Sequence, residues 1–176
     1  MKFYINSDIN YPKELSKTLR QIRKELGDNY TKPFLSLHLT YIGCEGADLN
    51  LLKERITAVA KNLKPIDIEI VGVGNIGTDL VYLKVRKNAR LSKINRFLYD
   101  SFPKGCKVSN HWRPKNYAPH LTPMYGVKDR KTLNKILTML KPVKFPIKAE
   151  LTHIGIRKYN PPYFKGKPKL VYIVKL

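Results

Sequence analysis

The chain has 176 residues, and its 34 Lys and Arg against 13 Asp and Glu give a formal net charge of +21 at pH 7. This excess favours polyanionic partners, with nucleic acid as the first candidate; a surface that is basic only for solvation is the alternative. No apolar run approaches membrane-spanning length and no N-terminal signal pattern is visible, so we expect a soluble, cytoplasmic monomer without a protein partner. The two cysteines, Cys44 and Cys106, form neither a disulfide framework nor a metal-ligand spacing, so we expect no metal or other cofactor.

The first half of the chain, about residues 1–78, predicts the order strand, helix, strand, helix, strand. Apolar residues recur at helical spacing in two segments, and Pro12 and Asp48 stand where a helix start accepts a proline or an N-cap. The elements are a strand at 2–5, a helix with the apolar face Leu15, Leu19, Ile22 and Leu26, a strand at 35–43, a helix with the apolar face Leu52, Ile56, Val59 and Leu63, and a strand at 66–71.

A glycine-rich segment at residues 72–77 fits the pattern G-x-G-x-x-G of dinucleotide-binding proteins. Such a site needs a helix directly after the glycines, because the helix amide groups bind the pyrophosphate. Residues 80–85 instead read as a strand. We therefore interpret the segment as a connection between two strands and reject a dinucleotide site.

The second half, about residues 79–176, repeats the order of the first. Its elements are a strand at 80–85, a helix with the apolar face Leu91, Ile94, Leu98 and Phe102, a strand at 118–126, a helix after the cap Asp129 with the apolar face Leu133, Ile136, Leu137 and Leu140, a strand at 148–156 and a closing strand at 169–174. The repetition indicates an internal duplication. We expect residues 1–176 to form a single bilobal domain whose two lobes face each other across a cleft.

Two identical tripeptides, His38-Leu39-Thr40 and His120-Leu121-Thr122, lie 82 residues apart in equivalent strands of the two halves. Alternate residues of a strand share a face, so each His lies beside the Thr two positions on. Two imidazoles can take and give a proton at a phosphodiester while the hydroxyls hold the phosphate oxygens. The alternative, two satisfied core histidines, does not account for the repetition.

Basic and aromatic residues alternate before and after the second motif. Arg113 and Lys115, with Lys104 and Lys107, accompany Trp112 and Tyr117, a mixture that suits a nucleotide base and its phosphate. An ordinary surface loop with Trp112 in the core is the alternative. A second group, Arg157, Lys158, Tyr159, Tyr163 and Phe164, surrounds Pro161-Pro162 and fits either a loop over the cleft or a plain connection between strands. The candidate substrate contacts are Tyr41, Trp112, Arg113, Lys115, Tyr125 and Arg157.

One His-x-Thr motif in each half of a duplicated chain resembles the 2H phosphoesterase superfamily, which includes LigT-type 2′-5′ RNA ligases and cyclic phosphodiesterases. The resemblance implies an α+β fold of two duplicated β-α-β-α-β lobes with antiparallel-rich sheets, metal-independent chemistry, His38 and His120 as the acid–base pair, and Thr40 and Thr122 as phosphate ligands. Two departures from the family pattern stand out. Pro123 replaces a hydrophobic residue and is expected to bend its strand, and Gly166–Tyr172 replaces the usual Gly-Pro-x-Tyr.

Three functions follow as hypotheses. The first is a phosphodiesterase, with possible ligation in reverse, that acts on 2′,3′-cyclic phosphates or 2′-5′ linkages of RNA or oligonucleotides. The second keeps the chemistry and changes the substrate to cyclic nucleotides or cyclic oligonucleotides, as in anti-immune enzymes of the superfamily. The third is a basic RNA-binding module without catalysis, which explains the charge but leaves the paired motifs unexplained.

Overall fold

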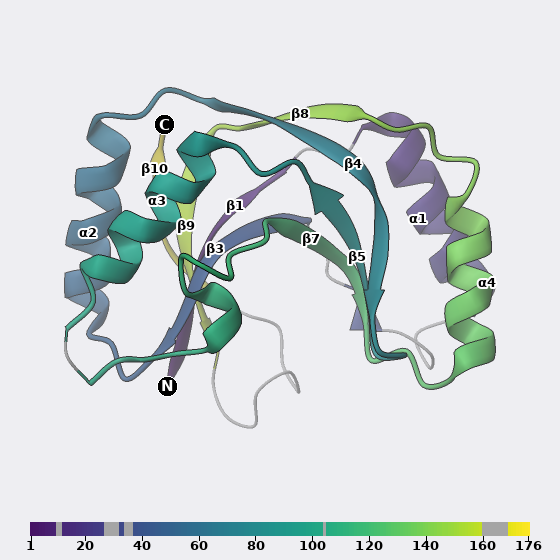
Figure 1. Cartoon of the computed structure of the whole chain (residues 1–176), viewed down its shortest axis with the longest axis horizontal. Helices are drawn as coiled ribbons and strands as arrows, with labels where there is room; N and C mark the ends of the chain where they lie inside the picture. Colours follow the sequence, from purple (N-terminus) through teal and green to yellow (C-terminus); the bar gives the residue numbers. More distant parts are fainter. Residues whose placement is uncertain (10–11, 27–31, 34–36, 104, 160–168) are drawn as a thin grey trace.

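A computed structural model describes residues 1–9, 12–26, 32–33, 37–103, 105–159 and 169–176. Its strands form one curved sheet, which Figure 1 shows as an arch with a pair of helices at each end. The helices are α1 (Lys13–Leu26), α2 (Leu49–Lys61), α3 (Ala89–Asp100) and α4 (Arg130–Leu140), with a 3₁₀ turn, η1 (Asn110–Trp112). The strands are β1 (Lys2–Asp8), β2 (Lys32–Pro33), β3 (His38–Glu45), β4 (Ile66–Ile76), β5 (Leu80–Val85), β6 (Lys107–Val108), β7 (His120–Tyr125), β8 (Ile147–Leu151), β9 (His153–Tyr159) and β10 (Lys169–Lys175).

The sheet has the strand order β10-β9-β1-β3-β7-β5-β4-β8, with the short strands β2 and β6 attached to β7 and β3. Every strand pair in the described part of the chain is antiparallel. The β3–β7 pair lies at the centre of this order, where β3 ends the group β10-β9-β1-β3 and β7 begins the group β7-β5-β4-β8. The predicted α+β fold with an antiparallel sheet is therefore confirmed, and the two His-Leu-Thr strands are direct neighbours.

Elements from the two halves of the chain are exchanged between the two ends of the sheet. Strand β4, from the first half, pairs with β5 and β8, whereas β9, from the second half, pairs with β1. The helices follow the same exchange, because α1 packs against α4 and α2 against α3 (Figure 1). Each end of the sheet therefore combines strands and helices from both halves of the chain, because a repeated order of elements does not determine which sheet edge a strand joins.

One predicted strand, 148–156, is two strands in the structure. Strand β8 ends at Leu151 and β9 begins at His153, and the two strands lie in opposite halves of the sheet. The apolar residues change from odd positions, ending at Leu151, to even positions, starting at Ile154, so the alternation breaks where the chain passes from β8 to β9. The glycine segment leads into a strand and not a helix, as expected, but β4 extends through it to Ile76, so only the short turn before β5 connects the two strands.

The sheet buries one face under the helices and leaves the other face more open. In β5, Val81, Leu83 and Val85 belong to the core, whereas Tyr82 and Lys84 alternate with them and point to the other face. The predicted caps Asp48 and Asp129 accept hydrogen bonds from the first backbone amides of α2 and α4. Among the described residues, no helix is long and apolar enough to cross a membrane.

Candidate active site

The two His-Leu-Thr motifs meet at the centre of the sheet. Leu39 of β3 pairs with Leu121 of β7, and both side chains are fully buried in the core. In an antiparallel pair this register sets His38 beside Thr122 and Thr40 beside His120, with all four side chains on the face opposite the two leucines. His38 and His120 are then diagonal neighbours, whose Cα atoms lie about 7–8 Å apart in a regular strand pair. That spacing is suited to a phosphate between the two rings.

His120 is held by a hydrogen bond and by two aromatic rings. Its Nδ1 lies 2.8 Å from the carbonyl oxygen of Ala118, and because a carbonyl only accepts, Nδ1 carries the proton. Proton exchange with a ligand is thereby left to Nε2. The ring stacks on Trp112, with centroids 5.9 Å apart and planes at 11°, and meets the edge of Tyr82 at 5.6 Å. The orientation of the imidazole is thus fixed from two sides.

Tyr82 reaches His120 because β4 carries no side chain beside it. Gly74 pairs with Tyr82, and a Cβ added at Gly74 would lie 2.5 Å from the Cζ atom of that ring. Gly74, the middle glycine of the segment that imitates a dinucleotide motif, therefore has a packing role next to the candidate site.

Trp112 is held in place by a buried amide that sequence reasoning missed. Asn95 of α3 is fully buried, and its Nδ2 donates to the carbonyl oxygens of Tyr41 at 2.8 Å and Trp112 at 2.9 Å. Gly43 leaves the room that the indole needs, because a Cβ there would lie 3.1 Å from the Trp112 Nε1. A polar residue on the apolar face of a predicted helix, between Leu91 and Leu98, was the available signal for Asn95.

His38 has a different environment, built by β1 and β9. Asp8 of β1 pairs with His38, and Asn6 pairs with Thr40. Arg157 of β9, which is 8% exposed, donates to both carboxylate oxygens of Asp8 at 2.7 and 2.8 Å and to Oδ1 of Asn6 at 2.7 Å. The predicted strand 2–5 was too short. Asn6 and Asp8 continue it with polar residues at alternate positions, which is the signal that would have placed them on the site's face.

Charges near Asp8 keep its side chain ionised. Burial raises the pKa of Asp8, but hydrogen bonds and charge from Arg157, together with the charges of His38 and His153, outweigh burial and lower the pKa below its usual value. The pKa of His111 is also lowered, by burial first and then by the charges of His120 and Lys2, which favours its neutral form. The site therefore has an ionised carboxylate, bound by Arg157, on the His38 side.

The other predicted substrate contacts occupy different positions. Tyr41 is fully buried and hydrogen-bonded to Ser7 at 2.9 Å, so its ring belongs to the core and not to a ligand surface. Simple alternation already sets Tyr41 on the face of Leu39, opposite His38 and Thr40, so the strand pattern itself argues against the predicted contact. Trp112 is 6% exposed, and its indole packs against the His120 ring.

Three further candidates lie at or near the surface. Arg113 and Lys115 are exposed in the loop before β7, and Tyr125 is half-buried at the end of that strand. Next to Pro123 the β5–β7 register shifts between Val81 and Leu83, which agrees with the expected bend. Lys104 and the segment 161–164, with its Tyr163 and Phe164, lie outside the described residues.

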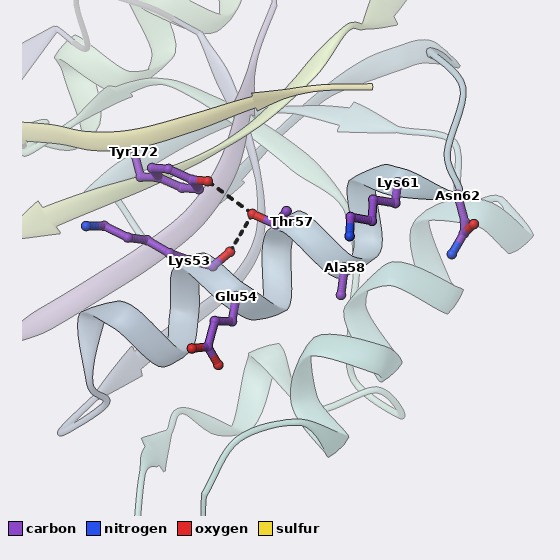
Figure 2. A pocket seen from close by; sticks show the side chains of 7 residues that line it. All are labelled: Lys53, Glu54, Thr57, Ala58, Lys61, Asn62 and Tyr172. Atoms are coloured by element: carbon purple, nitrogen blue, oxygen red, sulfur yellow. Dashed lines mark hydrogen bonds between the residues drawn. The ribbon is translucent and has the colours of Figure 1, made fainter.

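A separate pocket of about 520 Å³ lies between α2 and β10, on the helix side of the sheet (Figure 2). Its Tyr172 hydroxyl is 3.1 Å from that of Thr57, and the Lys53 ammonium lies 5.7 Å from the Tyr172 ring centre. No residue of the two motifs lines it. The pocket has no arrangement of acid and base comparable to the paired histidines.

Known structures match this chain over nearly its whole length. A family model described as the 2′-5′ RNA ligase superfamily matches residues 11–161. TT0787 of Thermus thermophilus is 15% identical, with 100% of this chain and 98% of that one covered and a TM-score of 0.67. E. coli LigT complexed with 3′-AMP is 17% identical, with 99% and 97% covered and a TM-score of 0.63. Usb1 of Kluyveromyces marxianus is 8% identical, with 99% and 97% covered and a TM-score of 0.55. No curated protein sequence matches this chain.

Proposed function

The chain belongs to the 2′-5′ RNA ligase superfamily, and from this premise we propose that it is a metal-independent phosphodiesterase of RNA or oligonucleotides. Its substrates are 2′,3′-cyclic phosphates or 2′-5′ linkages. His38 and His120 act as the acid–base pair, and Thr40 and Thr122 bind the phosphate. The observation that carries the proposal is the pairing of Leu39 with Leu121, because this register brings both motifs to one face of the sheet.

Hydrolysis of a cyclic phosphate illustrates the chemistry that two imidazoles provide. A neutral imidazole removes a proton from water as the water oxygen bonds to phosphorus, and the imidazolium gives its proton to the ribose oxygen whose bond to phosphorus breaks. Attacking and leaving oxygens lie on opposite sides of phosphorus, which matches rings at diagonal positions. Each proton transfer contributes roughly 10²–10⁴-fold to the rate. The threonine hydroxyls donate to the non-bridging oxygens, where negative charge is concentrated.

The charge of the chain favours an RNA or oligonucleotide substrate. Arg113 and Lys115 precede the second motif, within a chain of net charge +21. Such residues attract the phosphates that flank the reacting one and make binding dependent on salt. LigT, which shares the fold, has been crystallised with 3′-AMP, ATP, NADP+ and phosphate, and these ligands support a nucleotide substrate here.

A panel of substrates in EDTA tests the proposal. The protein is incubated with 2′,3′-cyclic nucleotides, RNA ending in a 2′,3′-cyclic phosphate, 2′-5′ oligoadenylate and cyclic dinucleotides, beside His38→Ala and His120→Ala. We expect turnover of one of the first three substrates and a loss of at least about 10²-fold in either variant. Near-wild-type turnover in either variant would refute the pairing. Turnover of cyclic dinucleotides alone would favour the second substrate class, and salt-sensitive RNA binding without turnover would favour a binding module.

A further inference from the structure

We propose that Asp8, held by Arg157, is a positioning residue that keeps His38 in its protonated form and thereby makes His38 the general acid and His120 the general base. This inference rests on the proposed function and adds to it the assignment of the two roles. It is carried by the pairing of Asp8 with His38 and by the contacts that immobilise the Asp8 carboxylate.

The pair of strands β1 and β3 aligns a polar row with the motif. Asp8 stands beside His38, and Asn6 beside Thr40, so the acidic side chain neighbours the imidazole across the strand pair. Arg157 binds Asp8 through both carboxylate oxygens and also bonds to Asn6, which removes the freedom of the carboxylate to turn away. Since Arg157 and Asn6 are both buried, this arrangement is part of the framework of the sheet.

The two histidines have different charged and titratable neighbours. His38 faces Asp8 of β1, with Arg157 and His153 of β9 behind that carboxylate. The attraction between His38 and Asp8 is among the causes that lower the pKa of Asp8, and the same attraction favours the imidazolium form of His38.

His120 has no described carboxylate partner. It pairs with Lys84 of β5. The Nδ1 hydrogen bond to the Ala118 carbonyl oxygen leaves Nε2 as the proton acceptor of the neutral ring. Of these two histidines, only His38 has a carboxylate beside it among the described residues, and this difference between the two imidazoles carries the assignment of acid and base.

In the resulting reaction, Nε2 of His120 takes the proton of the attacking water while His38 gives its ring proton to the departing ribose oxygen. Both histidines exchange their protonation states in one turnover, and solvent restores them. The role of Asp8 is limited to His38, since no proton passes to the carboxylate.

The matched test uses Asp8→Asn, which keeps the shape and removes the charge, with the exposed Asp100→Asn as the control for net charge. The four histidine signals are followed by proton NMR against pH, and the His38 signal is assigned by its absence in His38→Ala. We expect the His38 titration midpoint to move about 0.5–1 unit to lower pH in Asp8→Asn and to stay in place in Asp100→Asn. An unchanged His38 midpoint in folded Asp8→Asn would overturn the inference.

Kinetics supply the second measurement. In Asp8→Asn the alkaline limb of the pH–rate profile should shift to lower pH, together with the His38 titration midpoint. We expect kcat to fall roughly 10-fold or more, with KM nearly unchanged. Asp8→Glu retains the charge and should restore the alkaline limb. If Asp8→Asn does not fold, Asp8→Glu and Arg157→Lys replace it in the test. Asp8→Glu must leave the His38 titration midpoint in place. Arg157→Lys must change that midpoint, because it releases the Asp8 carboxylate from its two hydrogen bonds. If His38→Ala remains active, the proposed function fails, while the NMR midpoint still decides the role of Asp8.

Discussion

Replacement of Asn95 by Leu tests whether the position of Trp112 against His120 depends on one buried amide side chain. The substitution removes the donors to the carbonyl oxygens of Tyr41 and Trp112. Each buried carbonyl left unpaired costs about 1–3 kcal/mol, which gives roughly 2–6 kcal/mol for the two. Leu also removes the Asn95 Oδ1, which has no hydrogen-bond partner among the described residues, and this relief offsets about 1–2 kcal/mol. The difference spans about 0–5 kcal/mol, and we expect a net loss near its middle, about 2–3 kcal/mol of unfolding free energy.

Urea unfolding followed by fluorescence measures this loss directly, because Trp112 is the single tryptophan of the chain. The same signal reports the site, since protonated imidazole quenches a stacked indole and His120 lies against Trp112. In Asn95→Leu we expect weaker quenching at low pH together with lower activity. Asn75→Ala, an exposed residue in the β4–β5 hairpin, should change stability by no more than about 0.5 kcal/mol. A loss below about 1 kcal/mol in Asn95→Leu, with unchanged quenching, would refute the reasoning.

Three further outcomes are expected. Gly74→Ala places a methyl group against the Tyr82 ring, so urea unfolding should show a loss of about 1–3 kcal/mol, largely recovered in the double variant with Tyr82→Ala; equal losses in both would contradict the contact. Thr122→Val should lower kcat/KM about 10²–10³-fold and weaken inhibition by phosphate, whereas unchanged inhibition would remove Thr122 from the phosphate site. Burial raises the pKa of Asp8, but Arg157 and the nearby histidines lower it overall, so the ionised carboxylate stabilises the fold at neutral pH and this contribution is lost as pH falls through the folded-state pKa. Unfolding between about pH 2 and 6 should therefore depend less on pH in Asp8→Asn, and equal slopes would argue against a lowered pKa.

Local patterns carried much of the fold prediction. The helices at residues 13–26, 49–61 and 130–140 follow from apolar spacing and caps, which are properties of a few neighbouring residues. The motif strands follow from alternation, and their repetition indicated that they belong together. Nothing local indicates that β4 and β9 are exchanged between the ends of the sheet, because strand partners are chosen by packing across the whole chain.

The candidate site was predicted only as far as its motifs. Asp8, Asn95 and Tyr82 were missed because each acts through a neighbour brought close by folding, and no spacing in the chain connects Asp8 with Arg157. Tyr41 was misplaced although strand alternation sets it on the buried face of Leu39, opposite His38 and Thr40. Trp112 was predicted either to contact a nucleotide base or to lie in the core, and the structure places it in the core against the His120 ring.

A crystal structure with 3′-AMP bound tests the central claim most directly. The account predicts the phosphate on the open face at the β3–β7 junction, with a ring nitrogen of His38 and of His120 and the hydroxyls of Thr40 and Thr122 within hydrogen-bond distance. A phosphate that contacts only one of the two imidazoles, or that binds in the pocket beside Tyr172, would contradict it.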